Sequence, residues 1–208
     1  MNKKVLTVDY GMGNLWSVQN ALRYLGSEPV LSSDPEKIRS ADFLILPGVG
    51  SFRRAIEVLR KTGMEEAILE AVKSGAKILG ICLGMQLLGA SSTEDGFTEG
   101  LRLVPLPVEK FSPEELDGNK IPHIGFNTVS FSRRAGLFNR LPEAADFYFV
   151  HSFRMTAPGT FNGMTGTCNY GGTPFLAAFQ KENIYGTQFH PEKSQTNGLL
   201  LLRYFLEN

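Results

Sequence analysis

Lys77-Ile-Leu-Gly-Ile-Cys82-Leu-Gly-Met-Gln86 joins a short apolar segment to a turn that carries a cysteine between two glycines. The segment Lys77 to Ile81 predicts a buried strand, and the residues after Cys82 predict the start of a helix. A cysteine on such a sharp strand-to-helix turn occupies the position of a nucleophile elbow. Gly80 and Gly84 flank it two positions away on either side, where missing side chains permit a strained backbone and close packing.

Strands and helices alternate upstream of this turn. Apolar, β-branched runs predict strands at Val5 to Asp9, Glu28 to Leu31 and Asp42 to Leu46, and helical spacing predicts helices from Leu15 to Leu25, Phe52 to Lys61 and Glu65 to Ser74. Such alternation is typical of an α/β fold, in which helices cover both faces of a central, mostly parallel sheet.

The pattern changes after about residue 100. Short alternating segments predict added antiparallel strands at Thr128 to Phe131, Phe147 to Val150, Pro174 to Phe179 and Ile184 to Phe189. A last helix is expected from Asn197 to Leu206, and surface loops at Ser91 to Gly100, Ser112 to Lys120 and Arg133 to Asp146. No repeat or linker divides the 208 residues, so we expect a single domain over 1–208.

Composition limits the kind of partner. Basic and acidic residues number 21 each, and no long block of like charge occurs, so neither nucleic acid nor an anionic membrane is an expected partner. We find no signal peptide and no apolar run long enough to span a bilayer. Two cysteines without secretory context do not predict a disulfide, and the expected location is the cytoplasm.

A nucleophilic cysteine needs a base, and the chain has three histidines, His123, His151 and His190, with no spacing suited to a metal site. Glu192 follows His190 by two positions. In an extended segment such residues point to the same side, so the carboxylate could fix the tautomer of the ring. Cys82, His190 and Glu192 would then form an acyl-transfer triad. The plainer alternatives are a buried core cysteine and a structural histidine at a strand end.

These residues resemble the triad-type, or class I, glutamine amidotransferases, whose motifs are G-x-C-x-G-x-Q and a later H-P-E. A third matching block, Pro47-Gly-Val-Gly50, supplies the second wall of the oxyanion hole in that family. The resemblance implies a flavodoxin-like fold and no cofactor. It also implies hydrolysis of L-glutamine to glutamate and ammonia through a cysteinyl thioester, with amides at Val49, Gly50 and Leu83 stabilising the oxyanion.

The resemblance also implies roles for residues outside the triad. Gly50, Gln86 and Glu94 would bind glutamine together with Ser152 and Phe153. For Gln86 the alternative is a solvent-facing helix residue, and for Glu94 part of an acidic loop. His123 and His151 are expected to be structural residues, and Cys168 to be inert.

Within the family, the chain from Val5 to Leu206 resembles the glutaminase subunits of imidazole glycerol phosphate synthases, through blocks such as Asp9-Tyr-Gly-Met-Gly-Asn14. Their partner is a cyclase subunit of the HisF type, a (β/α)8 barrel that receives ammonia in a heterodimer and forms imidazole glycerol phosphate and an aminoimidazole carboxamide ribotide in histidine biosynthesis. By resemblance, Asn14, Tyr148 and Lys193 would face that partner.

One position departs from this branch. Phe126 stands in Gly125-Phe-Asn127, where the histidine-pathway members usually carry tryptophan. A related branch supplies ammonia for amidine formation on bacterial surface sugars, and that assignment stays open as an alternative. Rivals from other classes are a cysteine hydrolase or chaperone-like protein of similar architecture, and a non-catalytic interaction module. Activity that depends on glutamine would distinguish an amidotransferase from the first rival. The intact triad residues argue against the second.

Overall fold

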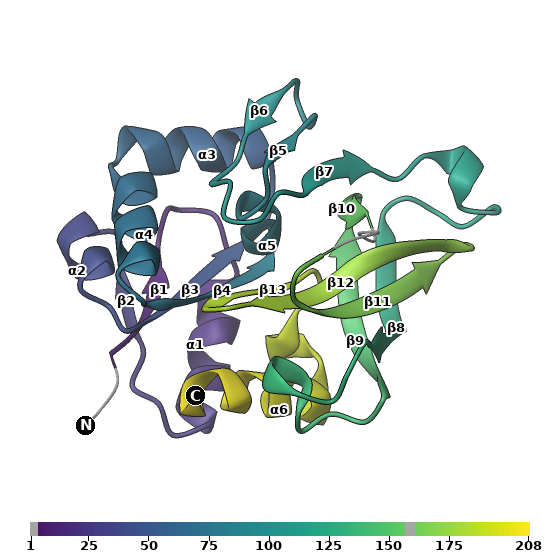
Figure 1. The fold of residues 1–208 in the computed structure, drawn as a ribbon. Coiled ribbons are helices and arrows are strands. Elements are labelled where there is room, and N and C mark those ends of the chain that lie inside the picture. The colour runs from purple at the N-terminus through teal and green to yellow at the C-terminus, as the bar shows by residue number, and fades with distance from the viewer. Residues whose placement is uncertain (1–3, 157–160) are drawn as a thin grey trace.

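A computed structural model describes residues 4–156 and 161–208. One part of its sheet consists of five parallel strands in the spatial order β2-β1-β3-β4-β13 (Figure 1). Their bounds are β1 Val5–Val8, β2 Val30–Ser32, β3 Phe43–Gly48, β4 Lys77–Cys82 and β13 Ile184–Thr187. β4 lies between β3 and β13, so the end of β4 is enclosed by strands on both sides.

Antiparallel pairing begins at β13 and extends the sheet through β12, β10, β7, β5 and β6, although β5 and β7 run parallel. A branch leaves β12 through β11 to β8 and β9. The bounds are β5 Ser91–Ser92, β6 Thr98–Glu99, β7 Pro107–Lys110, β8 His123–Phe131, β9 Ala144–His151, β10 Phe153–Thr156, β11 Met164–Tyr170 and β12 Thr173–Lys181.

Helices cover both faces of the parallel part (Figure 1). α1 and α6 pack on one face through an apolar cluster that includes Leu22 and Phe205, and α2, α3 and α4 pack on the other through a cluster that includes Ile56 and Ile68. The bounds are α1 Leu15–Tyr24, α2 Pro35–Arg39, α3 Phe52–Lys61, α4 Met64–Lys73, α5 Leu83–Leu87 and α6 Gln195–Glu207, with 3-10 turns η1 Pro113–Glu115, η2 Gly136–Phe138 and η3 Pro191–Lys193.

The α/β fold with antiparallel additions is therefore confirmed. Some details of the sequence prediction were wrong. The predicted loop Ser91 to Gly100 contains the hairpin β5–β6, the strand predicted to reach Phe189 ends at Thr187, and the short helix α2 was missed. Two-residue strands and a five-residue helix carry too little periodicity to be recognised from sequence.

Glycines let α5 lie directly against the sheet. A Cβ atom on Gly84 would lie 1.7 Å from the carbonyl oxygen of Leu46 in β3, and one on Gly80 would lie 2.7 Å from the backbone of Gly84. Because both contacts involve backbone atoms, neither neighbour can turn aside. The glycines around the cysteine turn are thus required by packing, as their spacing indicated.

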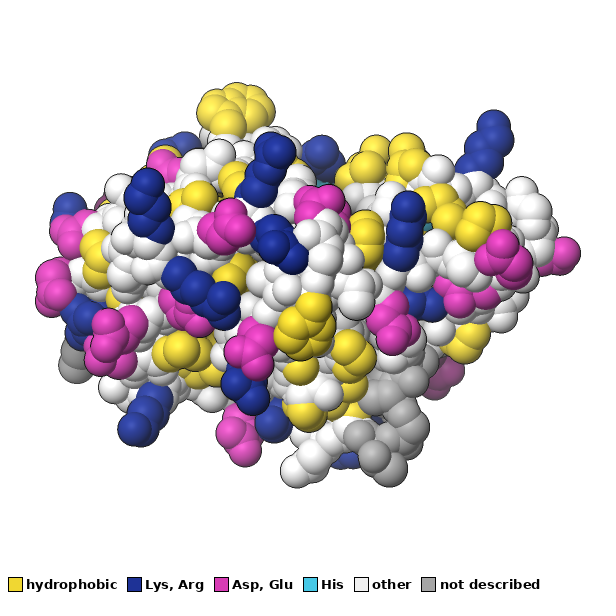
Figure 2. Space-filling model, turned by 90° about the horizontal axis from the view of Figure 1, so that it is seen from above, with side chains coloured by type: hydrophobic (Ala, Val, Ile, Leu, Met, Phe, Trp, Pro, Cys, Tyr) yellow, Lys and Arg dark blue, Asp and Glu magenta, His cyan; other side chains and the backbone are white. Residues whose placement is uncertain are grey.

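Among residues 4–156 and 161–208, no helix combines the length and the apolar character needed to cross a bilayer. On the face seen in Figure 2, basic and acidic side chains are interspersed, and neither sign forms a large continuous area.

Candidate active site

Cys82 ends β4 and directly precedes α5, with φ 54° and ψ −112°. A positive φ is strained for a residue that carries a Cβ, and such strain persists only where the surroundings impose it. Here β3 and β13 hold the strand on both sides, and the glycine contacts hold the helix that follows. The geometry at Cys82 is that of a nucleophile elbow.

His190 and Glu192 lie in contact, with 2.8 Å between Nδ1 of the imidazole and Oε1 of the carboxylate. The predicted contact is present, but the reason given for it was wrong. Pro191–Lys193 forms a 3-10 turn, not an extended segment, and this turn swings the carboxylate back to the ring. Ser194 fixes the turn by donating its hydroxyl hydrogen to the His190 carbonyl at 2.6 Å.

The surroundings of His190 favour its protonated form. Burial alone would lower the pKa of the imidazole, but the nearby Cys82 sulfur and the Glu192 carboxylate outweigh it and raise the pKa to about 10. Because Glu192 occupies Nδ1, Nε2 is the nitrogen left to exchange a proton with the sulfur. The arrangement therefore suits an imidazolium beside a thiolate.

We expect this raised pKa to make folding depend on pH. Because the folded-state pKa of His190 exceeds the ordinary value, its contribution to stability is complete below about pH 6.5 and is lost as pH rises toward 10. The free energy of unfolding, measured by urea titration at several pH values, should fall across this window. Glu192→Gln should flatten the fall because it removes one cause of the shift, and an equally steep fall in that variant would contradict this assignment.

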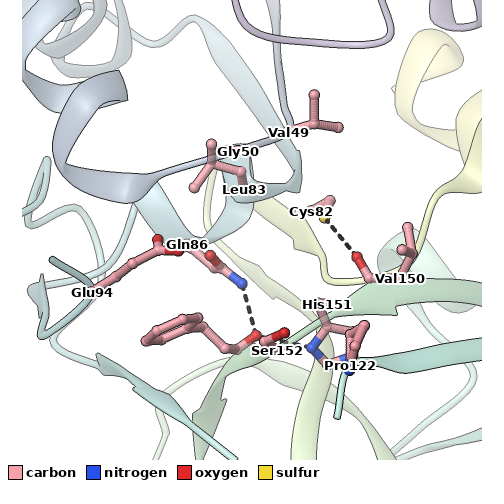
Figure 3. A pocket seen from close by; sticks show the side chains of 11 residues that line it. Val49, Gly50, Cys82, Leu83, Gln86, Glu94, Pro122, Val150, His151 and Ser152 are labelled. Carbon is pink, nitrogen blue, oxygen red and sulfur yellow. Dashed lines mark hydrogen bonds between the residues drawn. The ribbon is translucent and has the colours of Figure 1, made fainter.

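Cys82 lies at a cavity of about 330 Å³ that sits between α5, the segment after β3 and the junction of β9 and β10 (Figure 3). All of the predicted oxyanion and glutamine-binding residues line this cavity. They are Val49, Gly50, Leu83, Gln86, Glu94, Ser152 and Phe153. Pro122, Val150 and His151 complete the lining and were not predicted. His190 and Glu192 do not line it, whereas Cys82 does.

The segment of Val49 and Gly50 lines the cavity on the same side as Leu83, across from Ser152 and His151 (Figure 3). Gly50 has φ +104°, a conformation that favours glycine, and Val49 is 43% exposed. Tyr10 anchors the start of this segment by donating its hydroxyl hydrogen to the Pro47 carbonyl at 2.7 Å. Burial and the negative charge of Cys82 raise the pKa of Tyr10, so the hydroxyl remains a donor.

Gln86 is buried in α5, which rules out a solvent-facing side chain. Its Nε2 donates to the Phe153 carbonyl at 2.8 Å, which ties α5 to the start of β10. Glu94 accepts a hydrogen bond from the amide of Phe52 at 2.8 Å, at the first turn of α3. Burial raises the pKa of Glu94, and that hydrogen bond partly counters the rise. Glu94 thus joins the β5–β6 hairpin to the cavity wall.

The other histidines form a neutral pair. His151 Nδ1 lies 2.9 Å from the Phe153 carbonyl oxygen and must donate to it. In a neutral ring, His151 Nε2 is then an acceptor, and it accepts from Nδ1 of His123 at 3.1 Å. Burial lowers the pKa of His123 to about 4 and that of His151 to about 3. Burial also raises the pKa of Cys168 to about 12, so this thiol stays protonated.

The residues predicted to face a partner lie at or near the surface. Lys193 places its Nζ 5.8 Å from the centre of the Tyr148 ring, and Phe126, which is 52% exposed, packs edge-on against the same ring. Asn14 precedes α1 and follows Gly13, where an added Cβ would lie 3.5 Å from Pro47. The structure thus brings Tyr148 and Lys193 together, and Asn14 stands near the cavity wall that contains Val49.

Comparison with known proteins agrees with this arrangement. The family described as "Glutamine amidotransferase class-I" matches residues 6–207. The chain is 42% identical over 207 residues to the imidazole glycerol phosphate synthase subunit HisH of Geobacter sulfurreducens, covering 98% of both chains. It is 44% identical over 205 residues to HisH of Moorella thermoacetica, covering 99% of this chain and 95% of that one. A solved glutamine amidotransferase, 21% identical, superposes with a TM-score of 0.74 over 98% of this chain and 97% of the other. The chain therefore belongs to the class I glutamine amidotransferase family.

Proposed function

We propose that this chain is the glutaminase subunit of an imidazole glycerol phosphate synthase, a single cytoplasmic domain over residues 1–208. The observation that carries the proposal is the position of Cys82, which lines the cavity and lies beside His190, whose ring contacts Glu192. Similarity over nearly the whole chain to subunits named HisH supports the choice of synthase.

Glutamine would enter the cavity with its amino-acid end toward Gln86 and Glu94 and its side-chain amide toward Cys82. Ser152 and Phe153 would line the same site. A cavity of this volume, with few polar groups on a largely apolar lining, suits a small polar ligand held in one orientation.

In the first chemical step, the Cys82 thiolate attacks the amide carbon, and an S–C bond forms while the carbonyl electrons move to oxygen. Amides at Leu83 and at Val49 or Gly50 would stabilise that oxyanion. As the C–N bond breaks, protonated His190 gives its proton to the leaving nitrogen, and ammonia departs from a glutamyl thioester.

In the second step, neutral His190 removes a proton from water as the oxygen attacks the thioester carbon. The C–S bond then breaks, glutamate leaves, and the thiolate and imidazolium return. Glu192 holds His190 in the required tautomer and stabilises its charge throughout.

Ammonia released into bulk water at neutral pH would be protonated and would lose its nucleophilicity, so the proposal includes a docked acceptor subunit. We assign that role to a (β/α)8-barrel cyclase of the HisF type and place Tyr148, Lys193 and Asn14 at the interface. The exposed ring of Phe126 beside Tyr148 supports a protein contact there.

The test is a glutaminase assay of the purified chain with and without a HisF-type cyclase and its nucleotide substrate. We expect the rate of glutamate release to rise at least tenfold with both present. The isolated subunit should have little glutaminase activity until the Pro47–Gly50 segment rearranges. Glutamate release by the chain alone that neither component increases would refute the regulatory part. Absence of any glutamine turnover in every combination would refute the glutaminase assignment.

Glu192→Gln should lower kcat by roughly 10- to 100-fold, less than loss of the nucleophile, because the residue orients the base and does not react. Glutamate release under saturating glutamine measures this effect. Glu207→Gln is a matched control, since that carboxylate contacts Arg140 at the surface, away from the cavity. Equal activity of the Glu192→Gln variant and the wild type would remove Glu192 from the mechanism.

Because of Phe126, the surface-polysaccharide branch stays open as the alternative acceptor of the ammonia. Its ring packs on Tyr148 at the proposed interface, so a change from tryptophan at this position alters the surface offered to the partner. If a HisF-type cyclase from histidine biosynthesis fails to stimulate the chain while a cyclase-like barrel from a surface-polysaccharide system does, the ammonia serves amidine formation.

A further inference from the structure

Gln188 lies between Gln86 and the sulfur of Cys82, on the segment that joins β13 to His190. Its side chain is completely buried. Its Nε2 lies 3.7 Å from Sγ of Cys82, and its Oε1 lies 3.0 Å from Nε2 of Gln86. The backbone amide of Gln188 donates to the Ala177 carbonyl at 2.8 Å, which fixes the residue to β12.

A backbone carbonyl determines which way these amides point. The carbonyl oxygen of Phe153 can only accept, so the atom of Gln86 that lies 2.8 Å from it must be the NH₂ nitrogen. The same nitrogen lies 3.0 Å from Gln188, so Gln188 must present its oxygen there. Its own NH₂ group therefore faces the sulfur. The Phe153 carbonyl thus fixes which amide atoms donate along the whole chain of hydrogen bonds, whatever the protonation state of Cys82.

We propose that Gln188 is a thiolate-stabilising and positioning residue, which donates an N–H hydrogen bond to Cys82 and connects the sulfur to Gln86 in the cavity wall. This inference rests on the function proposed above. A donor favours the charged form of its acceptor, so the amide holds Cys82 ready for attack. Because the Gln86 end lines the cavity, a ligand that moves Gln86 also changes the hydrogen bond at the sulfur.

Several other groups face the sulfur in the described part of the chain. His190 and Tyr10 are the titratable ones, from the segment after β13 and the turn after β1. The carbonyl oxygen of Val150 in β9 lies 3.9 Å away and favours the thiol as a donor. The amide of Gln188 is the neutral donor that opposes this carbonyl. Its removal leaves His190 as the group that opposes this carbonyl.

The test measures the rate of Cys82 alkylation by iodoacetamide against pH in the purified chain, since only the thiolate reacts. Gln188→Met removes both amide atoms at similar volume, and Gln188→Glu keeps the oxygen that faces Gln86 but replaces the donor. We expect the midpoint of the profile to rise by about one unit or more in both variants, which slows alkylation at neutral pH roughly tenfold. Cys82→Ala gives the background from Cys168.

Gln19→Met is the matched control, because Gln19 is also a buried glutamine and donates from Nε2 to Thr7 at 2.9 Å, outside the cavity. Its alkylation profile should coincide with that of the wild type. Folded Gln188 variants whose profiles also coincide with the wild type would overturn the proposal. A loss of glutaminase activity with unchanged profiles would likewise overturn it, because a purely structural role predicts that result.

A second measurement needs no change at position 188. In protein whose glutamine residues carry ¹⁵N, the side-chain amide NMR signal of Gln188 should shift as Cys82 titrates. This shift should be absent in Cys82→Ala. An amide signal that ignores the titration would overturn the proposal even if the Gln188 variants do not fold. Both readouts are independent of glutamine turnover, so they separate this inference from the proposed function.

Discussion

Cys82→Ala is expected to abolish glutamine hydrolysis, with a fall in kcat of about four orders of magnitude or more, because no other group can form the thioester. The fold should persist. Alanine has the same Cβ as cysteine, so the strain of φ 54° at the elbow does not change. Glutamate release measures the activity, and circular dichroism with thermal unfolding measures the fold.

Cys168→Ala is the control for the loss of a buried thiol, since Cys168 is fully buried in β11 and carries no predicted role. It should cost about 1 kcal/mol of stability or somewhat more and leave kcat unchanged. Near-normal glutaminase activity in Cys82→Ala, or equal losses in the two variants, would show that the elbow sulfur is not the nucleophile.

Gly84→Ala is expected to destabilise the chain by roughly 3 kcal/mol or more, which corresponds to about 6 to 12 °C in Tm. The added Cβ would lie 1.7 Å from the carbonyl oxygen of Leu46, a distance that requires α5 and β3 to separate. Glutaminase activity should fall as well, because Leu83 and Gln86 both belong to α5. Urea and thermal unfolding measure the loss of stability.

Gly13→Ala provides the comparison. A Cβ on Gly13 would make ordinary contacts of 3.5 Å with Leu15 and Pro47, and the residue does not need a positive φ. Its free energy of unfolding should change by less than about 1 kcal/mol. If Gly84→Ala were as stable as Gly13→Ala, the close approach of α5 to β3 would not be a requirement of the fold.

The parts of the site that sequence could predict are local. The turn at Cys82 is encoded by an apolar run, two glycines and the start of a helix within ten residues, and the His190–Glu192 contact spans three residues. The nearness of Val49 to Cys82 was expected only from the family resemblance, and the structure accounts for it because the parallel strands β3 and β4 pair Gly48 with Cys82. The fold class followed from the same alternation of strands and helices.

Long-range register explains what the sequence could not predict. Gln188 meets Cys82 because β13 pairs with β4, across 106 positions of the chain. His123 meets His151 because β8 and β9 pair with those two residues opposite each other. No local sequence pattern around Gln188 or His123 predicts these contacts. Tyr10 was part of a recognised motif, but only the structure gives its hydroxyl a specific acceptor, the Pro47 carbonyl.

The close contact of Gly84 with β3 has a consequence for inhibitors. α5 packs its backbone directly on β3 at Gly84, so the turn that carries the sulfur rests on the sheet, whereas Val49 is 43% exposed. A chloroketone that mimics glutamine would report access to the sulfur alone. An aldehyde analogue, which forms a reversible tetrahedral adduct, should bind more tightly if the Val49–Gly50 segment supplies the amide that we propose for the oxyanion. Comparing the two reagents would distinguish a resting enzyme from an activated one.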